Sequence, residues 1–394
     1  MIFNKQGALI KKHKFYYKNN IIENVREYKY LGFMFSCSGS DKTGINNLLK
    51  QAKKAWYALQ YYLKTSKNKK ISTYLHLFDT QVRPILLYAC ESWADSLKSG
   101  ENITDNIKKS EIERFHVSVL KQLLGVHKKT SNIALLLETG RHPMVVTAQL
   151  QAIKYFLRFP TIKQGRLMHS YYETEKHNLA NNDKFITFII NTLNKIGMSN
   201  IWREQLIQHR ELSKETKLIA NIKIRLKDIS SQTIISTLTT HPGKLTILAQ
   251  IKRTHEFESY LNINNFEHRR AISKIRTSSH KLEIETGRWK NTQQDKRICK
   301  NCALGTVEDE LHFLFDCPMH GIERKQLFNT VKCKINVDLL LNHTRADMIQ
   351  TLFTFGDLST LNALGKFIHH ALKKRDNTTC HILPSQYVYY QRKT

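Results

Sequence analysis

Residues 297–320 read RICKNCALGTVEDELHFLFDCPMH and hold three of the chain's seven cysteines. The spacing is Cys299-x2-Cys302-x9-His312-x4-Cys317. A Cys-x2-Cys pair brings two thiolates to one ion, and a histidine and a third cysteine complete a tetrahedral set. The spacing therefore predicts a structural zinc site with Cys299, Cys302, His312 and Cys317 as ligands. Four protein ligands leave no open position on the ion, so we do not expect catalytic zinc.

The sequence between the ligands predicts a short helix. Thr306 and Asp309 form a capping-box pattern, and the acidic residues around Asp309 suit a helix N-terminus. His312 would project from this helix. Cys317 lies five residues further on and off the same helical face, so we expect the helix to end near Phe315.

Two alternatives for this cluster stay open at the level of sequence. In the first alternative, no metal binds and the cysteines are unpaired buried thiols beside a chance histidine. In the second, His320 replaces His312 or Cys317 as a ligand. The other four cysteines are scattered along the chain. An odd total distributed in this way suits a reduced intracellular protein with one metal site better than a disulfide framework.

The chain is strongly basic. Lys and Arg number 62 against 33 Asp and Glu, which gives a formal net charge of +29. Such an excess opposes compact folding and is best explained by a polyanionic partner, either nucleic acid or an anionic membrane face. Residues 1–70 carry fifteen Lys and Arg against three acids, whereas residues 281–330 carry eight of each. The sequence has no apolar run long enough for a membrane-spanning helix and no signal-peptide cleavage site. We therefore expect an intracellular protein, nuclear rather than cytoplasmic.

The rest of the chain shows a short β-prone region followed by helical periodicity. Segment 14–25, KFYYKNNIIENV, predicts two strands around a tight turn at 18–20, and segment 27–38 predicts one further strand. From Asp41 the apolar period is helical. Its stripe comprises Ile45, Leu48, Leu49, Ala52, Ala55, Trp56, Leu59, Tyr62 and Leu63. Further helices are expected over 71–81, from Pro84, over 108–124 before Gly125 and over 145–159, and 160–250 is helical in period. The fold class is therefore mainly α with a small N-terminal β-hairpin or sheet remnant.

No complete catalytic constellation is visible. Enzymes that use two metal ions need carboxylates close together, and the chain contains no Asp-Asp dipeptide. It also lacks Gly-x-x-x-x-Gly-Lys, Gly-x-Ser-x-Gly and His-Glu-x-x-His patterns.

Five phrases, in order, resemble the C-terminal part of non-LTR retrotransposon reverse transcriptases. Four of them are IFNKQG (2–7), VREYKYLGFMFS (25–36), RPILLYACESW (83–93) and FHVSVLKQLLGVHKKTSNIALLLETGRHPM (115–144). The fifth is HKLEIETGRW (280–289) followed by the cysteine cluster, RICKNC with VEDELHFLFDCP. In order, they look like the end of the family's stretch after the catalytic palm motifs, its Y-x-Y-L-G region near the primer grip, its thumb, the helical stretch after the thumb and its zinc knuckle. In RPILLYACESW, Ala89 stands where the family usually has Gly, and the palm aspartates of the family would lie upstream of Met1.

The resemblance implies a C-terminal fragment of an RNA-directed DNA polymerase that is inactive alone. Its expected domains are a β remnant of the palm and primer-grip region (1–38), a helical thumb-like domain (39–159), a helical connector (160–250) and a zinc-knuckle nucleic-acid-binding domain (251–394). The implied partners are template RNA and target DNA, with no membrane, and a polymerase half supplied upstream or in trans. Structural Zn2+ is the implied cofactor, and Mg2+ is not expected in this fragment.

Phosphate contacts are expected from lysines and arginines on polar helix faces and before the knuckle. The candidates are Lys50, Lys53, Lys54, Lys67, Lys69, Lys70, Arg269, Arg270, Lys274 and Arg276. Trp56, Trp93 and Trp289 are expected in the core rather than as stacking platforms. The alternative function is a stand-alone zinc-stabilised protein-interaction module that binds no nucleic acid, and weak dependence of binding on salt would distinguish it.

Overall fold

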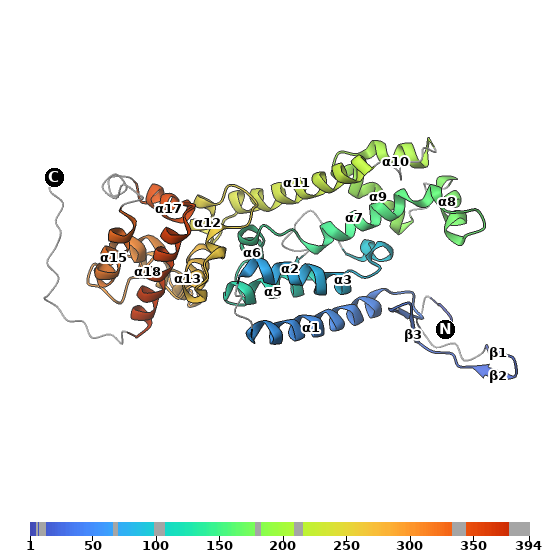
Figure 1. The fold of residues 1–394 in the computed structure, drawn as a ribbon, viewed down its shortest axis with the longest axis horizontal. Helices are drawn as coiled ribbons and strands as arrows, with labels where there is room; N and C mark the ends of the chain where they lie inside the picture. The colour runs from blue at the N-terminus through green and yellow to red at the C-terminus, as the bar shows by residue number, and fades with distance from the viewer. Residues whose placement is uncertain are drawn as a thin grey trace. The chain divides into compact units, whose positions relative to one another are not determined.

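The computed structural model describes residues 1–4, 7, 13–65, 70–97, 107–177, 183–208, 216–332 and 344–377. The chain forms two compact units. The first comprises Met1–Asn68, Thr73–Val117 and His142–Ile234, and the second comprises Lys69–Ser72, Ser118–Arg141 and Ile235–Thr394. Helices make up most of the described chain and two small β-hairpins lie near the N-terminus (Figure 1), which confirms the predicted fold class.

The first hairpin lies where the sequence predicts it. Strands β1 (Phe15–Tyr17) and β2 (Asn20–Ile22) pair antiparallel, with Phe15 opposite Ile22. Lys18 adopts the left-handed conformation in the turn, with φ of 52°. This conformation is uncommon for residues other than glycine, so Lys18 is the strained position of the turn.

The prediction of one further strand over 27–38 is wrong, because this segment folds back on itself. It forms a second antiparallel hairpin, β3 (Glu27–Tyr30) and β4 (Phe33–Ser36). Leu31 and Gly32 make the turn with φ of 45° and 90°, the two successive positive values that a tight hairpin turn requires. The Tyr88 hydroxyl donates a hydrogen bond to the Leu31 carbonyl, so a distant residue supports a conformation that leucine disfavours.

Helix α1 (Lys42–Thr65) follows the predicted apolar stripe. Leu48, Leu49, Ala52 and Trp56 are buried. Gly44 allows α1 to pack closely on β4, because a Cβ there would come within 2.1 Å of the Phe33 ring.

In the first unit, α3 and η1 pack on α1, whereas η2, η3 and α9 pack on α7. Pro84 sits in the first turn of α3, and the chain enters it through a π-helical turn, η1. A proline lacks the N–H that would bond to residue i−4, and the ladder widens before it. Trp56 and Phe78 meet edge to face, with ring centroids 6.0 Å apart. The elements are α2 (Ile71–Leu77), η1 (Phe78–Val82), α3 (Arg83–Leu86), η2 (Cys90–Ser92), η3 (Ala94–Ser96), α7 (Met144–Leu157), η4 (Phe159–Thr161), α8 (Leu167–His177), α9 (Lys184–Lys195) and α10 (Ser199–Leu206).

Two helices, α5 (Glu111–Leu124) and α11 (Thr216–Thr240), begin in the first unit and end in the second. The second unit packs α13 and α15 against the long α18, and α12 against α17. Its elements are α6 (Asn132–Thr139), α12 (Thr246–Ile251), η6 (Ser259–Asn262), α13 (Phe266–Arg276), α14 (Glu283–Trp289), η7 (Gln294–Lys296), η8 (His312–Asp316), η9 (Pro318–His320), α15 (Gly321–Val331), α17 (Arg345–Thr354) and α18 (Leu358–Asn377). No described helix is both long enough and apolar enough to cross a membrane.

Candidate metal centre and basic surfaces

The four predicted ligands come together in the second unit. The ligand atoms of Cys299, Cys302, His312 and Cys317 all lie within 4.8 Å of one another, and together they could hold a metal ion. The Cys302 Sγ atom lies 3.5 Å from His312 Nε2. Ligands about 2.0–2.3 Å from a tetrahedral ion are separated by roughly 3.5–3.8 Å, so this spacing fits a four-coordinate centre with little movement.

A π-helical turn brings His312 and Cys317 to the same side of the chain. Element η8 spans His312–Asp316, and the Cys317 amide donates to the His312 carbonyl at 2.7 Å, five residues back. The helix ends within one residue of the predicted position. It is wider than an α-helix, however, and in the wider turn residues i and i+5 nearly align.

The expected capping box is wrong in its roles. Asp309 caps the helix itself, because its carboxylate accepts a hydrogen bond from the His312 amide at 2.7 Å. Thr306 is freed from that task, and its hydroxyl lies 3.0 Å from His312 Nδ1. A partner on one ring nitrogen fixes the orientation of the ring and leaves the other nitrogen, Nε2, facing the cysteines.

A short ladder carries the first two cysteines. Ile298 and Val307 form an antiparallel bridge, and the Cys299 amide donates to the Thr306 carbonyl at 2.9 Å. Glu308, which follows the bridge, accepts two hydrogen bonds from Arg375 of α18, at 2.6 and 2.7 Å. Bidentate pairs of this kind fix geometry as well as adding energy, so α18 holds the cluster in place.

Burial and neighbouring groups favour the thiol forms of Cys299 and Cys302 when no cation is bound. A hydrogen bond with Cys317, together with burial, raises the pKa of Cys299 to about 12. Burial also raises the pKa of Cys302. A divalent cation at the centre would displace these protons, because thiolates are the metal-binding form. The donor set therefore fits a metal that favours sulfur and nitrogen ligands.

His320, the spare ligand, is not part of the cluster. Its ring packs edge to face on Phe313, with centroids 4.9 Å apart, and burial lowers its pKa to about 4. It is a buried neutral histidine beside the centre.

The lysines of α1 lie at the surface. Lys50, Lys53 and Lys54 are exposed and line a shallow depression together with Tyr57, whose exposed fraction is 58%. Tyr61 continues this face one helical turn further on and is 70% exposed. We call these five residues the α1 basic face. Their spacing places cations and aromatic rings on one side of the helix.

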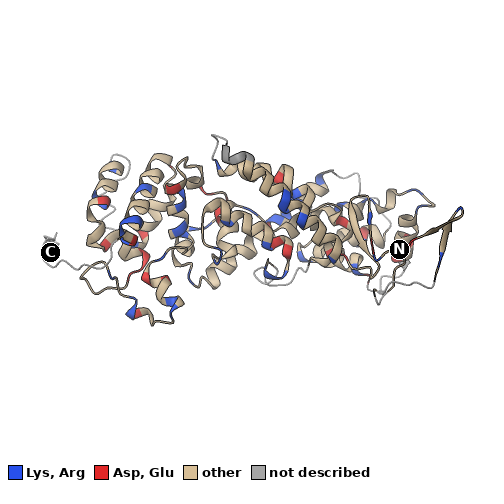
Figure 2. Cartoon of the chain, turned by 90° about the horizontal axis from the view of Figure 1, so that it is seen from below, with Lys and Arg blue, Asp and Glu red and all other residues tan. Residues whose placement is uncertain are grey.

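Of the three candidate lysines just after α1, the structure describes one. Lys67 and Lys69 lie outside the described residues, and Lys70 is exposed immediately before α2. Lys and Arg occur on helices throughout the described chain, so no single block accounts for the charge (Figure 2).

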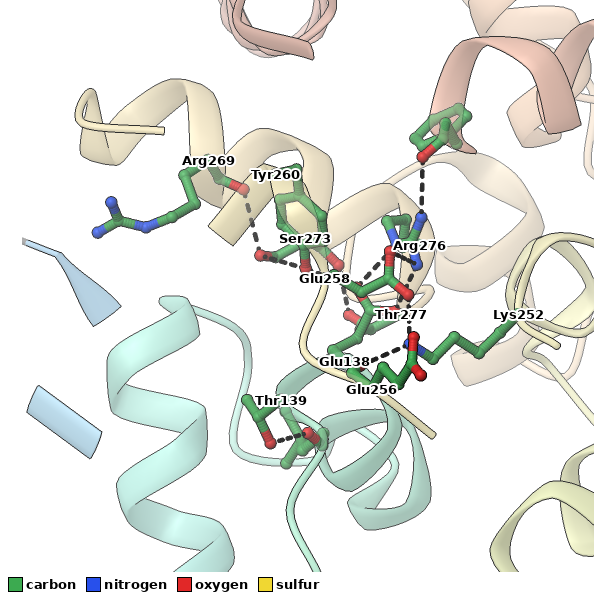
Figure 3. A network of polar contacts seen from close by, with 12 residues as sticks. Glu138, Thr139, Lys252, Glu256, Glu258, Tyr260, Arg269, Ser273, Arg276 and Thr277 are labelled. Carbon is green, nitrogen blue, oxygen red and sulfur yellow. Dashed lines mark hydrogen bonds and ion pairs between the residues drawn. The ribbon is translucent and has the colours of Figure 1, made fainter. Parts of the chain in front are cut away.

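Two of the four arginines and lysines expected before the knuckle are interior residues, which corrects the expectation for them. Arg276 is 1% exposed, and its guanidinium bonds both carboxylate oxygens of Glu138, at 2.7 and 2.8 Å, and one of Glu258, at 2.9 Å (Figure 3). Arg269 is 3% exposed and donates to the Ile263 carbonyl. Neither guanidinium faces solvent, so neither can reach a phosphate.

The other two residues of that group are half-buried. Arg270 donates to the Gly125 carbonyl at 2.9 Å and forms an ion pair with Glu267. Burial and the charge of Arg270 lower the pKa of Lys274. Both line a depression beside Glu267 and Asp376, so their charge is partly compensated.

Trp56 and Trp93 are fully buried, as expected, but Trp289 is 60% exposed. The prediction of a core position for Trp289 is therefore wrong. Trp289 is the last residue of α14, and its neighbours Arg288 and Lys290 are also exposed.

Comparisons of this chain with protein-family models, with curated proteins and with solved structures find no match in any of the three.

Proposed function

We propose that this chain is a nucleic-acid-binding module of the kind found at the C-terminal end of non-LTR retrotransposon reverse transcriptases, with a zinc-stabilised knuckle. The observation that carries the proposal is the α1 basic face. Lys50, Lys53 and Lys54 project from one side of a well-anchored helix and stand beside exposed tyrosines. Nucleic-acid-binding surfaces commonly combine cations, which contact the phosphates, with aromatic rings, on which bases stack.

Zinc is the metal that the knuckle suits best. Three cysteines and one histidine form the cluster, and thiolate-rich tetrahedral sites select zinc over the oxygen-preferring Mg2+ and Ca2+. All four positions would be filled by protein, so the ion would stabilise the fold and would not take part in chemistry.

The net charge supports a polyanionic partner. A formal charge of +29 is far beyond what solubility requires, and helix α1 carries exposed lysines with no acidic residue in its own sequence. The phrases at 25–36, 83–93 and 115–144 and the knuckle support the reverse-transcriptase relationship, in which template RNA and target DNA are the partners. The sequence contains no Asp-Asp dipeptide, and in the proposed relationship polymerase activity would be supplied by another segment or chain.

Salt dependence of binding tests the proposal. Each phosphate contact on duplex DNA contributes roughly −0.9 to the slope of log K against log salt. We expect a steep slope for the wild-type chain. Changing Lys50, Lys53 and Lys54 together to Ala should reduce its magnitude by up to about 2.7, which is three contacts.

A charge-matched control is available on α11. Lys217, Lys223 and Lys227 are exposed there, so their triple alanine variant loses the same charge without touching α1. The control should change the slope much less than the α1 variant does. A wild-type slope near zero would refute the proposal and favour the protein-interaction alternative, and equal losses in both triple variants would show that only overall charge matters.

A further inference from the structure

Trp289 is an exposed aromatic ring that packing does not explain. It is the last residue of α14, and 60% of its surface is open. The His127 ring lies beside it, with centroids 6.5 Å apart and planes inclined by 34°. His127 belongs to the loop after α5, so two segments far apart in sequence place two exposed rings together. We call Trp289 and His127 the ring pair.

The loop that carries His127 is held by polar contacts behind the ring. The His127 amide donates to Ser279 Oγ at 2.9 Å, and His127 Nδ1 accepts from the Lys129 amide at 3.2 Å. Thr130 also bonds Ser279 Oγ, at 2.9 Å. These bonds fix the loop, so the His127 ring has a set position beside Trp289.

The knuckle positions the helix that carries Trp289. Arg297, at the start of the knuckle, donates to the carbonyls of Ile284 and Thr292, at 2.9 and 2.9–3.0 Å. A Cβ at Gly287 would meet the Arg297 side chain at 2.6 Å, so the glycine allows this clamp to close. The Ile284 amide bonds the Glu308 carbonyl at 3.0 Å. The start of α14 and the segment just after it are thus tied to the chain that carries Cys299 and His312.

The surroundings of the ring pair are cationic. Lys128, Lys129, Arg288 and Lys290 are exposed, and the sequences 125–132 and 286–292 contain no acidic residue. Arg288 reaches Glu285 at 3.3 Å, but that carboxylate is itself buried. An apolar protein partner would have to desolvate these charges without compensation. A base with its flanking phosphates matches both the rings and the cations.

We propose that Trp289, with His127 beside it, is a stacking platform for one unpaired base of a single-stranded nucleic acid, and that Lys128, Lys129 and Lys290 contact the adjoining phosphates. This inference rests on the proposed nucleic-acid function and deepens it, since it assigns single-stranded segments to a surface of the second unit. Base–aromatic stacking tolerates any base, so little sequence preference is expected.

The test compares a thymidine oligomer of about ten nucleotides with a DNA duplex, using the full chain. Trp289→Ala should weaken binding of the oligomer by about 5- to 150-fold, the usual range for loss of one stacked base, and should leave duplex binding within about twofold. Trp289→Phe should retain most of the affinity. Trp202→Phe, at a half-buried tryptophan of the first unit beside Arg203, is the matched control and should change neither.

Tryptophan emission supplies a second readout. The oligomer should quench emission of the wild-type chain and of Trp202→Phe but not of Trp289→Phe. Unchanged zinc content and circular dichroism would show that Trp289→Ala is folded. The inference is overturned if Trp289→Ala binds the oligomer like wild type, or if no quenching depends on Trp289. A steep salt slope on duplex DNA in that case leaves the proposed function standing, whereas absence of binding to either probe overturns both.

Discussion

Two basic helices of this chain look alike in sequence and play opposite parts in the structure. On α1, Lys50, Lys53 and Lys54 are exposed beside two tyrosines. On α13, Arg269 and Arg276 are buried, and Arg276 is paired with two glutamates. The segment EHRRAISKIR of α13 (267–276) and the segment KQAKKAWYAL of α1 (50–59) are equally basic. Local charge therefore does not tell whether a cation serves binding or stability.

The difference comes from what covers each helix. Helix α1 packs through one stripe on β4, η1 and α3, and its lysines lie off that stripe. Helix α13 packs against α18, α12 and η6, so little of its surface is left for solvent. A buried guanidinium needs acceptors. Glu138, Glu258 and the carbonyl of Phe353 provide them for Arg276, and the carbonyl of Ile263 provides one for Arg269.

The largest expected effect on stability comes from removing the metal, because this change should unfold the knuckle in the second unit and leave the first unit folded. A chelator, or Cys302→Ser, should abolish zinc binding and unfold the knuckle, since binding free energy in such sites is about 10–16 kcal/mol and is largely folding free energy. Elemental analysis should give one zinc per wild-type chain. Hydrogen exchange should speed up in α14 and leave α1 unchanged.

Cys37→Ser is the control for that experiment. Cys37 lies in the first unit and donates to the Gly7 carbonyl at 3.2 Å, a bond that serine can also make. Zinc content should stay at one per chain in this variant. Full zinc occupancy in Cys302→Ser would show that the ligand set is wrong.

The next effect sharpens the contrast between the two helices directly. Arg276→Met should destabilise the second unit by about 3–5 kcal/mol, because Glu138 would remain buried without its partner. Combining Arg276→Met with Glu138→Gln should recover part of the loss, since no uncompensated charge remains. Urea unfolding followed by hydrogen exchange of α13 amides measures both. A stable Arg276→Met variant with a reduced salt slope would contradict this contrast, because Arg276 would then serve binding rather than stability.

The lysines of α1 should show the reverse behaviour. Changing Lys50, Lys53 and Lys54 to Ala should alter the free energy of unfolding by no more than about 0.5 kcal/mol per substitution, because exposed positions contribute little and alanine favours helices. The same variant carries the reduced salt slope. Thermal unfolding is the measurement, and a large loss of stability would mean that these side chains have structural partners.

The smallest expected effect is one of pH on the second unit. Burial lowers the pKa of His255 from 6.5, although its ring nitrogen lies 3.1 Å from the carbonyls of both Leu136 and Arg141. The unfolded chain therefore binds this proton more readily than the folded chain. Its contribution to stability is present above about pH 6.5 and is lost as the pH falls through lower values. His255→Gln should flatten the stability curve between pH 7 and 5, and an unchanged curve would contradict the assignment.

The sequence alone located most helices and the cysteine and histidine cluster that could hold a metal ion. Ligand spacing is a local property, so Cys299, Cys302, His312 and Cys317 could be named from four letters and their separations. The apolar stripe of α1 is equally local, because a period of 3.6 residues places Leu48, Ala52 and Trp56 on one side whatever surrounds them.

Only the tertiary structure decided which polar and aromatic groups face solvent. Glu138 lies 138 residues from Arg276 along the chain, and no local pattern links the two. The Leu31-Gly32 turn depends in the same way on Tyr88, and the exposure of Trp289 depends on how Arg297 and the knuckle hold the end of α14. Periodicity and ligand spacing are written in neighbouring residues, whereas burial is set by whichever distant segments pack on top, and for that physical reason the sequence alone could not supply it.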